Sequence, residues 1–242
     1  MHIPPKDMEL RNRRWFGLGG RHGMTNRIAD FGPVLDRLEL SSMTAVDIGA
    51  AEGDIAQWLS GRFSFVQAHE LMEQAYSQLV ERFESVEHVS THQTDITQFP
   101  LTESHGAVFL LGVLHYFSSE ELRQKILTHC LESTEHLFIV RTGIRDFRQR
   151  DDRRMELAHR YTSLQTFLKS ASESFDLCVI DNGYRWTDDL RLGDLVVYKR
   201  RHTGGVLPEL SEMFGSTTGY LNRDQVEQAI CCEPLDPSET QQ

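Results

Sequence analysis

The stretch that decides the fold is Ala45-Val46-Asp47-Ile48-Gly49-Ala50-Ala51-Glu52-Gly53-Asp54. It begins with a short apolar run, which is typical of a buried strand, and continues into a turn of small residues. The residues from Ile55 onward have a helical period, so strand, turn and helix are expected in that order. Small residues let the chain turn sharply and let a ligand approach the backbone closely. The sequence therefore predicts a ligand site at the carboxyl end of the first strand.

Downstream of this turn, short aliphatic runs alternate with stretches of helical period. Strands that alternate with helices imply crossover connections and a parallel sheet covered on both faces. The last two runs are joined by a polar stretch too short for a crossover helix, so they are expected to pair antiparallel. An α/β fold with a doubly wound, seven-stranded, mostly parallel sheet and an antiparallel last strand is predicted. The expected strands are residues 44–48, 65–70, 88–93, 107–111, 136–140, 176–181 and 195–198.

The chain is expected to divide into three parts. An N-terminal arm and helix cover residues 1–39, a central domain covers 40–200, and an acidic, partly disordered extension covers 201–242. The extension holds two arginines against seven acidic residues. Within the central domain, Ser118 and Glu121 have the spacing of a capping box before the helix that follows the fourth strand.

Composition excludes several classes of protein. The 242 residues are 39% hydrophobic and 25% charged, as in a globular protein with an ordinary core, which excludes disordered and collagen-like chains. No apolar run approaches the roughly 20 residues of a membrane helix, and the N-terminus lacks an apolar signal core. A cytoplasmic protein that does not enter the membrane is therefore expected. The four cysteines lack metal-ligand spacing, so no metal site is predicted.

Charge is unevenly distributed along the sequence. The net charge of -11 weighs against broad binding to nucleic acid, because the phosphate backbone is also negative. Two stretches are nevertheless net positive. Residues 1–30 hold six Lys or Arg against three acids, and residues 141–160 hold seven Arg against four. These two stretches favour an acceptor or partner with negative charge.

The turn after the first strand also bears on the choice of cofactor. A dinucleotide-binding turn needs glycines at its first, third and sixth positions. Counted from Gly49, the third position is Ala51 and the sixth is Asp54. The carboxylates of Glu52 and Asp54 would repel a pyrophosphate and suit a positively charged ligand. These features argue against an NAD-dependent oxidoreductase, which stays an alternative.

The segment Asp47-Ile48-Gly49-Ala50-Ala51-Glu52-Gly53 resembles motif I of the class I S-adenosylmethionine-dependent methyltransferases, commonly written Asp-x-Gly-x-Gly-x-Gly. Ala51 stands where the family usually has its middle glycine. The family's Rossmann-like sheet, with an antiparallel last strand, matches the order of the predicted strands over roughly residues 40–200. The resemblance implies a methyltransferase catalytic domain with S-adenosyl-L-methionine as its cofactor.

The resemblance also implies where the cofactor binds. Glu70 ends the second strand, 23 residues after Asp47, where its carboxylate would accept two hydrogen bonds from ribose hydroxyls. Asp95 would face the adenine amino group, with Ile96 against the ring. A backbone carbonyl after the fourth strand would contact the methionine amino group. The residues assigned to the cofactor are Asp47, Gly49, Ala51, Gly53, Glu70, Asp95, Ile96, Leu111 and Gly112.

Three further residues are candidates on the acceptor side. His115 could act as a general base, since a histidine ordinarily titrates near neutrality, or it could orient the cofactor or pack beside Tyr116. Arg141 ends the fifth strand and, with the arginines after it, forms either a solvated face or a clamp for a carboxylate or phosphate. Tyr161 lies near the acceptor or packs at the entry to a helix.

A methyltransferase acting on a small or medium-sized acceptor, preferably anionic, is therefore expected. A tRNA or rRNA methyltransferase is the main alternative, because local basic stretches can bind RNA despite an acidic total. A small-molecule acceptor is favoured over nucleic acid. A non-catalytic binding module on the same fold is a further alternative. The sequence leaves open the atom that is methylated, the oligomeric state and the role of residues 201–242.

Overall fold

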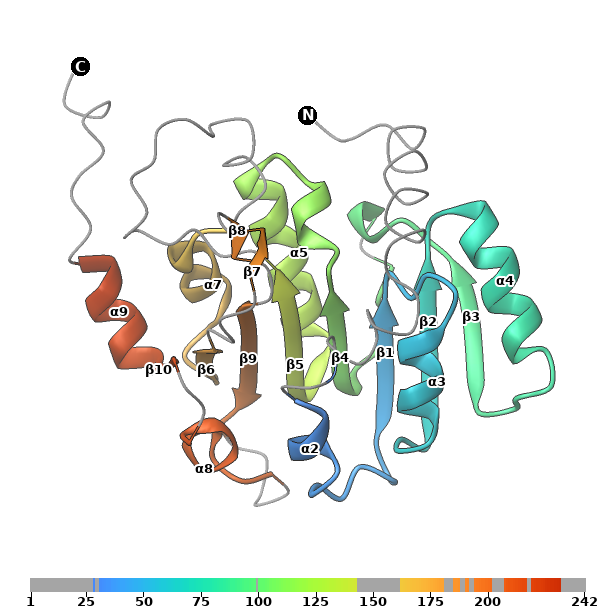
Figure 1. The fold of residues 1–242 in the computed structure, drawn as a ribbon, viewed down its shortest axis with the longest axis horizontal. Coiled ribbons are helices and arrows are strands. Elements are labelled where there is room, and N and C mark those ends of the chain that lie inside the picture. Colours follow the sequence, from blue (N-terminus) through green and yellow to red (C-terminus); the bar gives the residue numbers. More distant parts are fainter. Residues whose placement is uncertain are drawn as a thin grey trace.

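An eight-stranded sheet forms the centre of the fold (Figure 1), in the order β10-β6-β9-β5-β4-β1-β2-β3. The structure is a computed structural model that describes residues 28, 31–98, 100–142, 162–180, 185–187, 190–191, 194–201, 207–216 and 219–231. The strands of the sheet are β1 (Thr44–Ile48), β2 (Phe65–Glu70), β3 (Val89–Gln93), β4 (His105–Leu111), β5 (Thr134–Thr142), β6 (Phe175–Ile180), β9 (Asp194–Arg200) and β10 (Tyr220–Asn222). A separate pair consists of β7 (Arg185–Thr187) and β8 (Leu190–Arg191).

The strand directions confirm the predicted topology. The strands β3, β2, β1, β4 and β5, neighbours in that order, run parallel to one another, whereas β9 runs antiparallel to both β5 and β6. In Figure 1 the arrowheads of β1, β4 and β5 therefore point to one edge of the sheet, and that of β9 points to the opposite edge. This places the carboxyl ends of the parallel strands, and the loops that follow them, along a single edge.

The sheet has one strand more than predicted. The extra strand, β10, pairs antiparallel with β6 and comes from the C-terminal part of the chain. With only three residues, it is too short to show an alternating pattern in the sequence. The division into residues 1–39, 40–200 and 201–242 stays a prediction, although β10 shows that the sheet continues beyond residue 200.

Helices cover the two faces of the sheet. One face packs against α2, α3, α4 and α8, and the other packs against α5, α7 and α9. In Figure 1, α3 lies in front of β1 and β2, and α5 is seen behind β4 and β5. The helices are α2 (Gly32–Leu35), α3 (Asp54–Ser60), α4 (Glu73–Phe83), α5 (Glu120–Glu132), α7 (Leu164–Ser170), α8 (Leu210–Phe214), α9 (Arg223–Cys231) and the short 3₁₀ turns η1 (Ile96–Gln98) and η2 (Leu114–Tyr116).

The helices on both faces of the sheet explain why the central strands are apolar at successive positions. Every residue of β4 is buried, because helices pack on both faces of the sheet. A strand buried on both faces is apolar at successive positions instead of alternating ones. This is the pattern that distinguishes residues 107–111 in the sequence.

The start of α5 corrects the predicted capping box. The N-cap is Ser119, whose hydroxyl accepts a hydrogen bond from the backbone N–H of Leu122 at 3.2 Å. Glu121 points outward and forms an ion pair with Lys125 at 2.7 Å. The cap therefore lies one residue later than predicted.

No helix in the described ranges combines the length and the apolar character that a bilayer crossing requires.

Candidate functional site

The turn after β1 has a backbone that favours glycine. Gly49, Ala51 and Gly53 all have positive φ angles, of 75°, 51° and 88°. A Cβ atom on Gly49 would lie 2.4 Å from Cγ2 of Val113, in the loop after β4. A Cβ atom on Gly53 would lie 2.6 Å from the ring of Phe83 on α4. Glycine is thus required at both positions by conformation and by close packing.

The turn is attached to the end of β2. The backbone N–H groups of Gly49 and Ala50 both donate to the carbonyl of His69, at 2.8 and 2.9 Å. The N–H of Ala51 donates to Oε2 of Glu70 at 2.8 Å. The ends of the first two strands therefore form one unit.

Glu70 has more partners than the sequence indicates. Its side chain is only 8% exposed, and its second oxygen, Oε1, accepts hydrogen bonds from the N–H groups of Leu71 and Met72 at 2.9 and 2.8 Å. Together with Ala51, three backbone N–H groups surround this carboxylate. The residue assigned to the ribose is also a structural part of the turn.

Asp47 lies close to this unit, on the same face of the sheet as Glu70. It is 2% exposed and stands opposite Ala68 of β2 and Phe109 of β4. Ala68 and Phe109 belong to the core beneath α3, and Glu70 follows Ala68 by two residues. Because side chains two apart share a face, Asp47 and Glu70 project to the α3 side. Two buried acids therefore lie near the carboxyl ends of adjacent strands.

Asp95 begins the turn after β3. Its Oδ1 accepts a hydrogen bond from the N–H of Thr97 at 2.8 Å, and the neighbouring Ile96 is buried. The N–H of Thr94 donates to the carbonyl of Glu70 at 3.0 Å, which fixes this turn beside β2. The structure thus brings Asp95 and Ile96 to the same sheet edge as Glu70.

The loop after β4 lies at the middle of this edge. Leu111 stands opposite Arg141 of β5, and the N–H of Gly112 donates to the carbonyl of Arg141 at 2.8 Å. Gly112 has a φ of 77°, and the nearest atom to a Cβ built there would be Cε1 of His115, at 3.9 Å. The ring of His115 packs beside that of Tyr116, with centroids 4.2 Å apart.

The structure describes only some of the residues predicted to contact the acceptor. Arg141 is half-buried at the end of β5, where the sequence places it. Tyr161 lies outside the described residues, as does the net-positive stretch 1–30 apart from residue 28. The same is true of the arginines Arg145, Arg148, Arg150, Arg153 and Arg154.

Asp54 is engaged in an ion pair, which changes the charge argument made from the sequence. Its Oδ1 lies 2.5 Å from Nη1 of Arg82 on α4. It is also the first residue of α3, where a negative charge interacts favourably with the helix dipole. The charge argument against a pyrophosphate therefore depends on Glu52, which is half-buried.

His69 is a residue that the sequence reasoning missed. It is buried, its Nδ1 lies 2.9 Å from Oγ1 of Thr94, and its ring stacks on His92 at 4.7 Å. Burial, followed by the nearby His92 and His105, lowers the pKa of His69 to about 4. His69 is therefore neutral at physiological pH. No sequence signal marks it, because its burial and its stacking partner are products of the tertiary fold.

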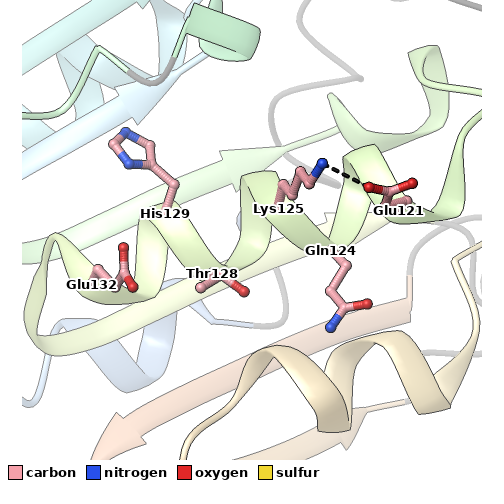
Figure 2. Close-up of a pocket in the computed structure, with 6 residues that line it drawn as sticks. All are labelled: Glu121, Gln124, Lys125, Thr128, His129 and Glu132. Atoms are coloured by element: carbon pink, nitrogen blue, oxygen red, sulfur yellow. Dashed lines mark ion pairs between the residues drawn. The ribbon is translucent and has the colours of Figure 1, made fainter.

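A hollow of about 480 Å³ lies elsewhere, along α5. Figure 2 shows the six side chains that line it, all from this helix: Glu121, Gln124, Lys125, Thr128, His129 and Glu132. None of the predicted site residues lines this hollow. In the described part of the chain, no three His, Cys, Asp or Glu side chains gather as metal ligands.

The comparisons with known proteins agree with this geometry. The family model of nodulation protein S (NodS) matches residues 34–145, which include the β1 turn and the ends of β2, β3 and β4. The N-methyltransferase NodS from Bradyrhizobium japonicum WM9, solved in complex with S-adenosyl-L-homocysteine, has a similar structure with a TM-score of 0.53. The two sequences are 16% identical, over 69% of this chain and 84% of that chain. These matches support a class I S-adenosylmethionine-dependent methyltransferase.

Two further solved structures are similar to this methyltransferase. Phosphoethanolamine N-methyltransferase 1 from Haemonchus contortus has a TM-score of 0.59 and 15% identity, over 86% of this chain and 52% of that chain. Magnesium protoporphyrin IX methyltransferase from Synechocystis PCC 6803 has a TM-score of 0.55 and 14% identity, over 74% of this chain and 79% of that chain. A comparison with curated proteins finds no match.

These findings confirm the predicted fold and the predicted class of enzyme. They favour a methyltransferase over an NAD-dependent oxidoreductase, since the matched family model and these similar structures are methyltransferases.

The neutral, buried His69 predicts that the methyltransferase loses stability in acid. The folded protein protonates His69 only near pH 4, whereas the unfolded chain does so near 6.5, so the unfolded state binds more protons between these values. The free energy of unfolding is expected to decrease as the pH falls through this range. The loss from this group is roughly 3 kcal/mol.

The measurement is urea unfolding at several pH values for the wild type, His69→Asn and His88→Asn. His69→Asn should lose less stability than the wild type over this pH range, and the exposed His88 provides a control that should behave as the wild type does. An equal loss of stability in His69→Asn and in the wild type would contradict the assignment.

Proposed function

We propose that this methyltransferase transfers the methyl group of S-adenosylmethionine to a small or medium-sized acceptor that carries an anionic group. The observation that supports the site is the convergence of four loops at one sheet edge. The glycine turn after β1, Glu70 after β2, Asp95 after β3 and Gly112 after β4 all lie there. In open α/β sheets, ligands bind along this edge, outside the carboxyl ends of the strands.

The residues at this edge suit the cofactor. When bound, S-adenosylmethionine supplies an electrophilic methyl group on a positively charged sulfonium. The carboxylates of Asp47 and Glu70 are acceptors for hydroxyl groups and favour positive charge. The missing side chain at Gly112 lets a ligand approach the backbone, whereas that at Gly49 makes room for Val113. The remaining assigned residues, Ala51, Gly53, Asp95, Ile96 and Leu111, shape the same loops.

The acceptor is proposed to bind near Arg141. This arginine is the penultimate residue of β5 and stands opposite Leu111, so it adjoins the loop proposed to hold the cofactor. A guanidinium group binds a carboxylate or a phosphate with two hydrogen bonds. We assign Tyr161 to the same side on sequence grounds alone. Two of the similar proteins, the phosphoethanolamine and magnesium protoporphyrin IX methyltransferases, are named for small-molecule substrates.

His115 is proposed to remove a proton from the acceptor. It lies in η2, three residues after Gly112 and hence beside the proposed methyl donor. An imidazole nitrogen of His115 would take the proton of an acceptor hydroxyl or ammonium group, which the transfer must release. Holding the acceptor in line with the methyl group supplies the rest of the rate enhancement.

An RNA acceptor is the less favoured proposal. The net charge of -11 opposes binding to phosphate backbones, and the net-positive stretches 1–30 and 141–160 lie largely outside the described residues. A cytoplasmic location also stays a prediction of the sequence.

The cofactor site can be tested by calorimetry with S-adenosylhomocysteine. The wild type is expected to give saturable heat, and Gly49→Ala should bind at least about tenfold more weakly, because the new Cβ displaces Val113. Gly219→Ala is the control, since Gly219 has a similar φ of 81° in the C-terminal segment. An absence of saturable heat in the wild type would refute the site.

Arg141 can be tested once an acceptor is found by screening small molecules with labelled cofactor. Arg141→Ala should raise the KM for the acceptor about tenfold or more, because a bidentate contact to its anionic group is lost. The affinity for S-adenosylhomocysteine should not change. Lys125→Ala removes a positive charge from the exposed surface of α5 and serves as the control. An effect confined to cofactor affinity would reject this role for Arg141.

His115 can be tested with the same acceptor. His115→Ala should lower kcat by about a hundredfold or more if His115 is the base, with cofactor affinity retained. The exposed His88 gives a matched control variant, His88→Ala. A rate of methyl transfer within a few-fold of the wild type would show that His115 is not the base.

A further inference from the structure

Ala51 has an unfavourable backbone conformation at the centre of the β1 turn. Its φ of 51° makes it the only residue other than glycine with a positive φ in the described part of the chain. Alanine disfavours this left-handed conformation, because its Cβ crowds the following carbonyl oxygen. Glycine would adopt it without strain. Some other interaction must therefore stabilise the turn around Ala51.

Glu70 supplies that interaction. Its Oε2 accepts the hydrogen bond from the N–H of Ala51 at 2.8 Å, across 19 residues of sequence. Its Oε1 is held by the N–H groups of Leu71 and Met72, so the carboxylate is fixed in position. Hydrogen bonds to a buried, charged acceptor are stronger than those between neutral groups.

The neighbouring backbone contacts do not replace this bond. The N–H groups of Gly49 and Ala50 donate to the carbonyl of His69, and the N–H of Gly53 donates to the carbonyl of Ala50. These bonds fix the residues on either side of Ala51. The N–H of Ala51 itself is held by the side chain of Glu70.

We propose that Glu70 is a positioning residue, whose carboxylate holds Ala51 in the left-handed conformation of the cofactor turn. An alanine can then stand where a glycine would otherwise be needed. This inference deepens the proposed function and rests on it for the identity of the ligand.

The same contacts limit how Glu70 can bind the ribose. A carboxylate has about four acceptor sites, and three are occupied by backbone N–H groups. Glu70 therefore has one acceptor site left for the ribose while it holds the turn, where the family resemblance implies two hydrogen bonds. A second hydroxyl needs a different partner.

The test is a double-mutant cycle with Glu70→Gln, Ala51→Gly and both changes together. A glutamine has one acceptor oxygen, which cannot serve all three N–H groups. Glu70→Gln should weaken the binding of S-adenosylhomocysteine about tenfold or more. Ala51→Gly alone gives the reference for the glycine change in the cycle. The double variant should bind at least about fivefold more tightly than Glu70→Gln, because glycine restores the turn.

The midpoint of thermal unfolding without ligand gives a second reading. Glu70→Gln should lower it, and Ala51→Gly should recover part of the loss. Glu73→Gln, at an exposed position in the first turn of α4, should behave like the wild type. If the two changes act independently in both measurements, with no rescue, the positioning role is overturned.

The outcomes separate this inference from the proposed function. Rescue in the unfolding measurement without any ligand binding in the wild type would refute the cofactor site and keep the role of Glu70 in the turn. If Glu70→Gln does not fold, amide exchange in the wild type decides the question. Strong protection of the Ala51 N–H supports the contact, and exchange at the rate of an exposed loop amide overturns it.

Discussion

The candidate site depends on the close approach of two loops at one edge of a parallel sheet. The turn after β1 and the loop after β4 meet at Gly49 and Val113, where a single added carbon would collide. Parallel topology makes this contact possible, since it brings the carboxyl ends of β1 and β4 side by side. The buried core on both faces of the sheet keeps the two strands in register.

Negative charge is the second constraint on the site. Asp47 and Glu70 are buried at adjacent strand ends, and burying a carboxylate is costly unless hydrogen bonds compensate. For Glu70, three backbone N–H groups provide that compensation and also shape the turn. Glu70, whose negative charge favours a positively charged ligand, thus also stabilises the turn at which that ligand is proposed to bind. Function and local stability are therefore linked at this residue.

Individual residues show which features of the structure could be predicted from the sequence and which could not. The strands, the antiparallel β9 and the glycine turn were predictable, because they depend on local periodicity and on residue types with restricted backbones. The N-cap of α5 was misplaced by one residue, because Ser118 and Ser119 are both suitable caps and only the observed hydrogen bond distinguishes them. The strand β10 was missed because its three residues gain their conformation from pairing with β6. The ion pair between Asp54 and Arg82 joins residues 28 positions apart, and no local pattern marks it.

By itself, the sequence determined the order of the seven predicted strands and the place of the ligand turn. These follow from which residues can be buried and which can adopt a positive φ. Only the tertiary structure decided what the side chains at that turn do, such as the bond from Ala51 to Glu70 and the stacking of His69 on His92. Such contacts join residues distant in the chain, and their strength depends on burial, which exists only after the sheet has formed.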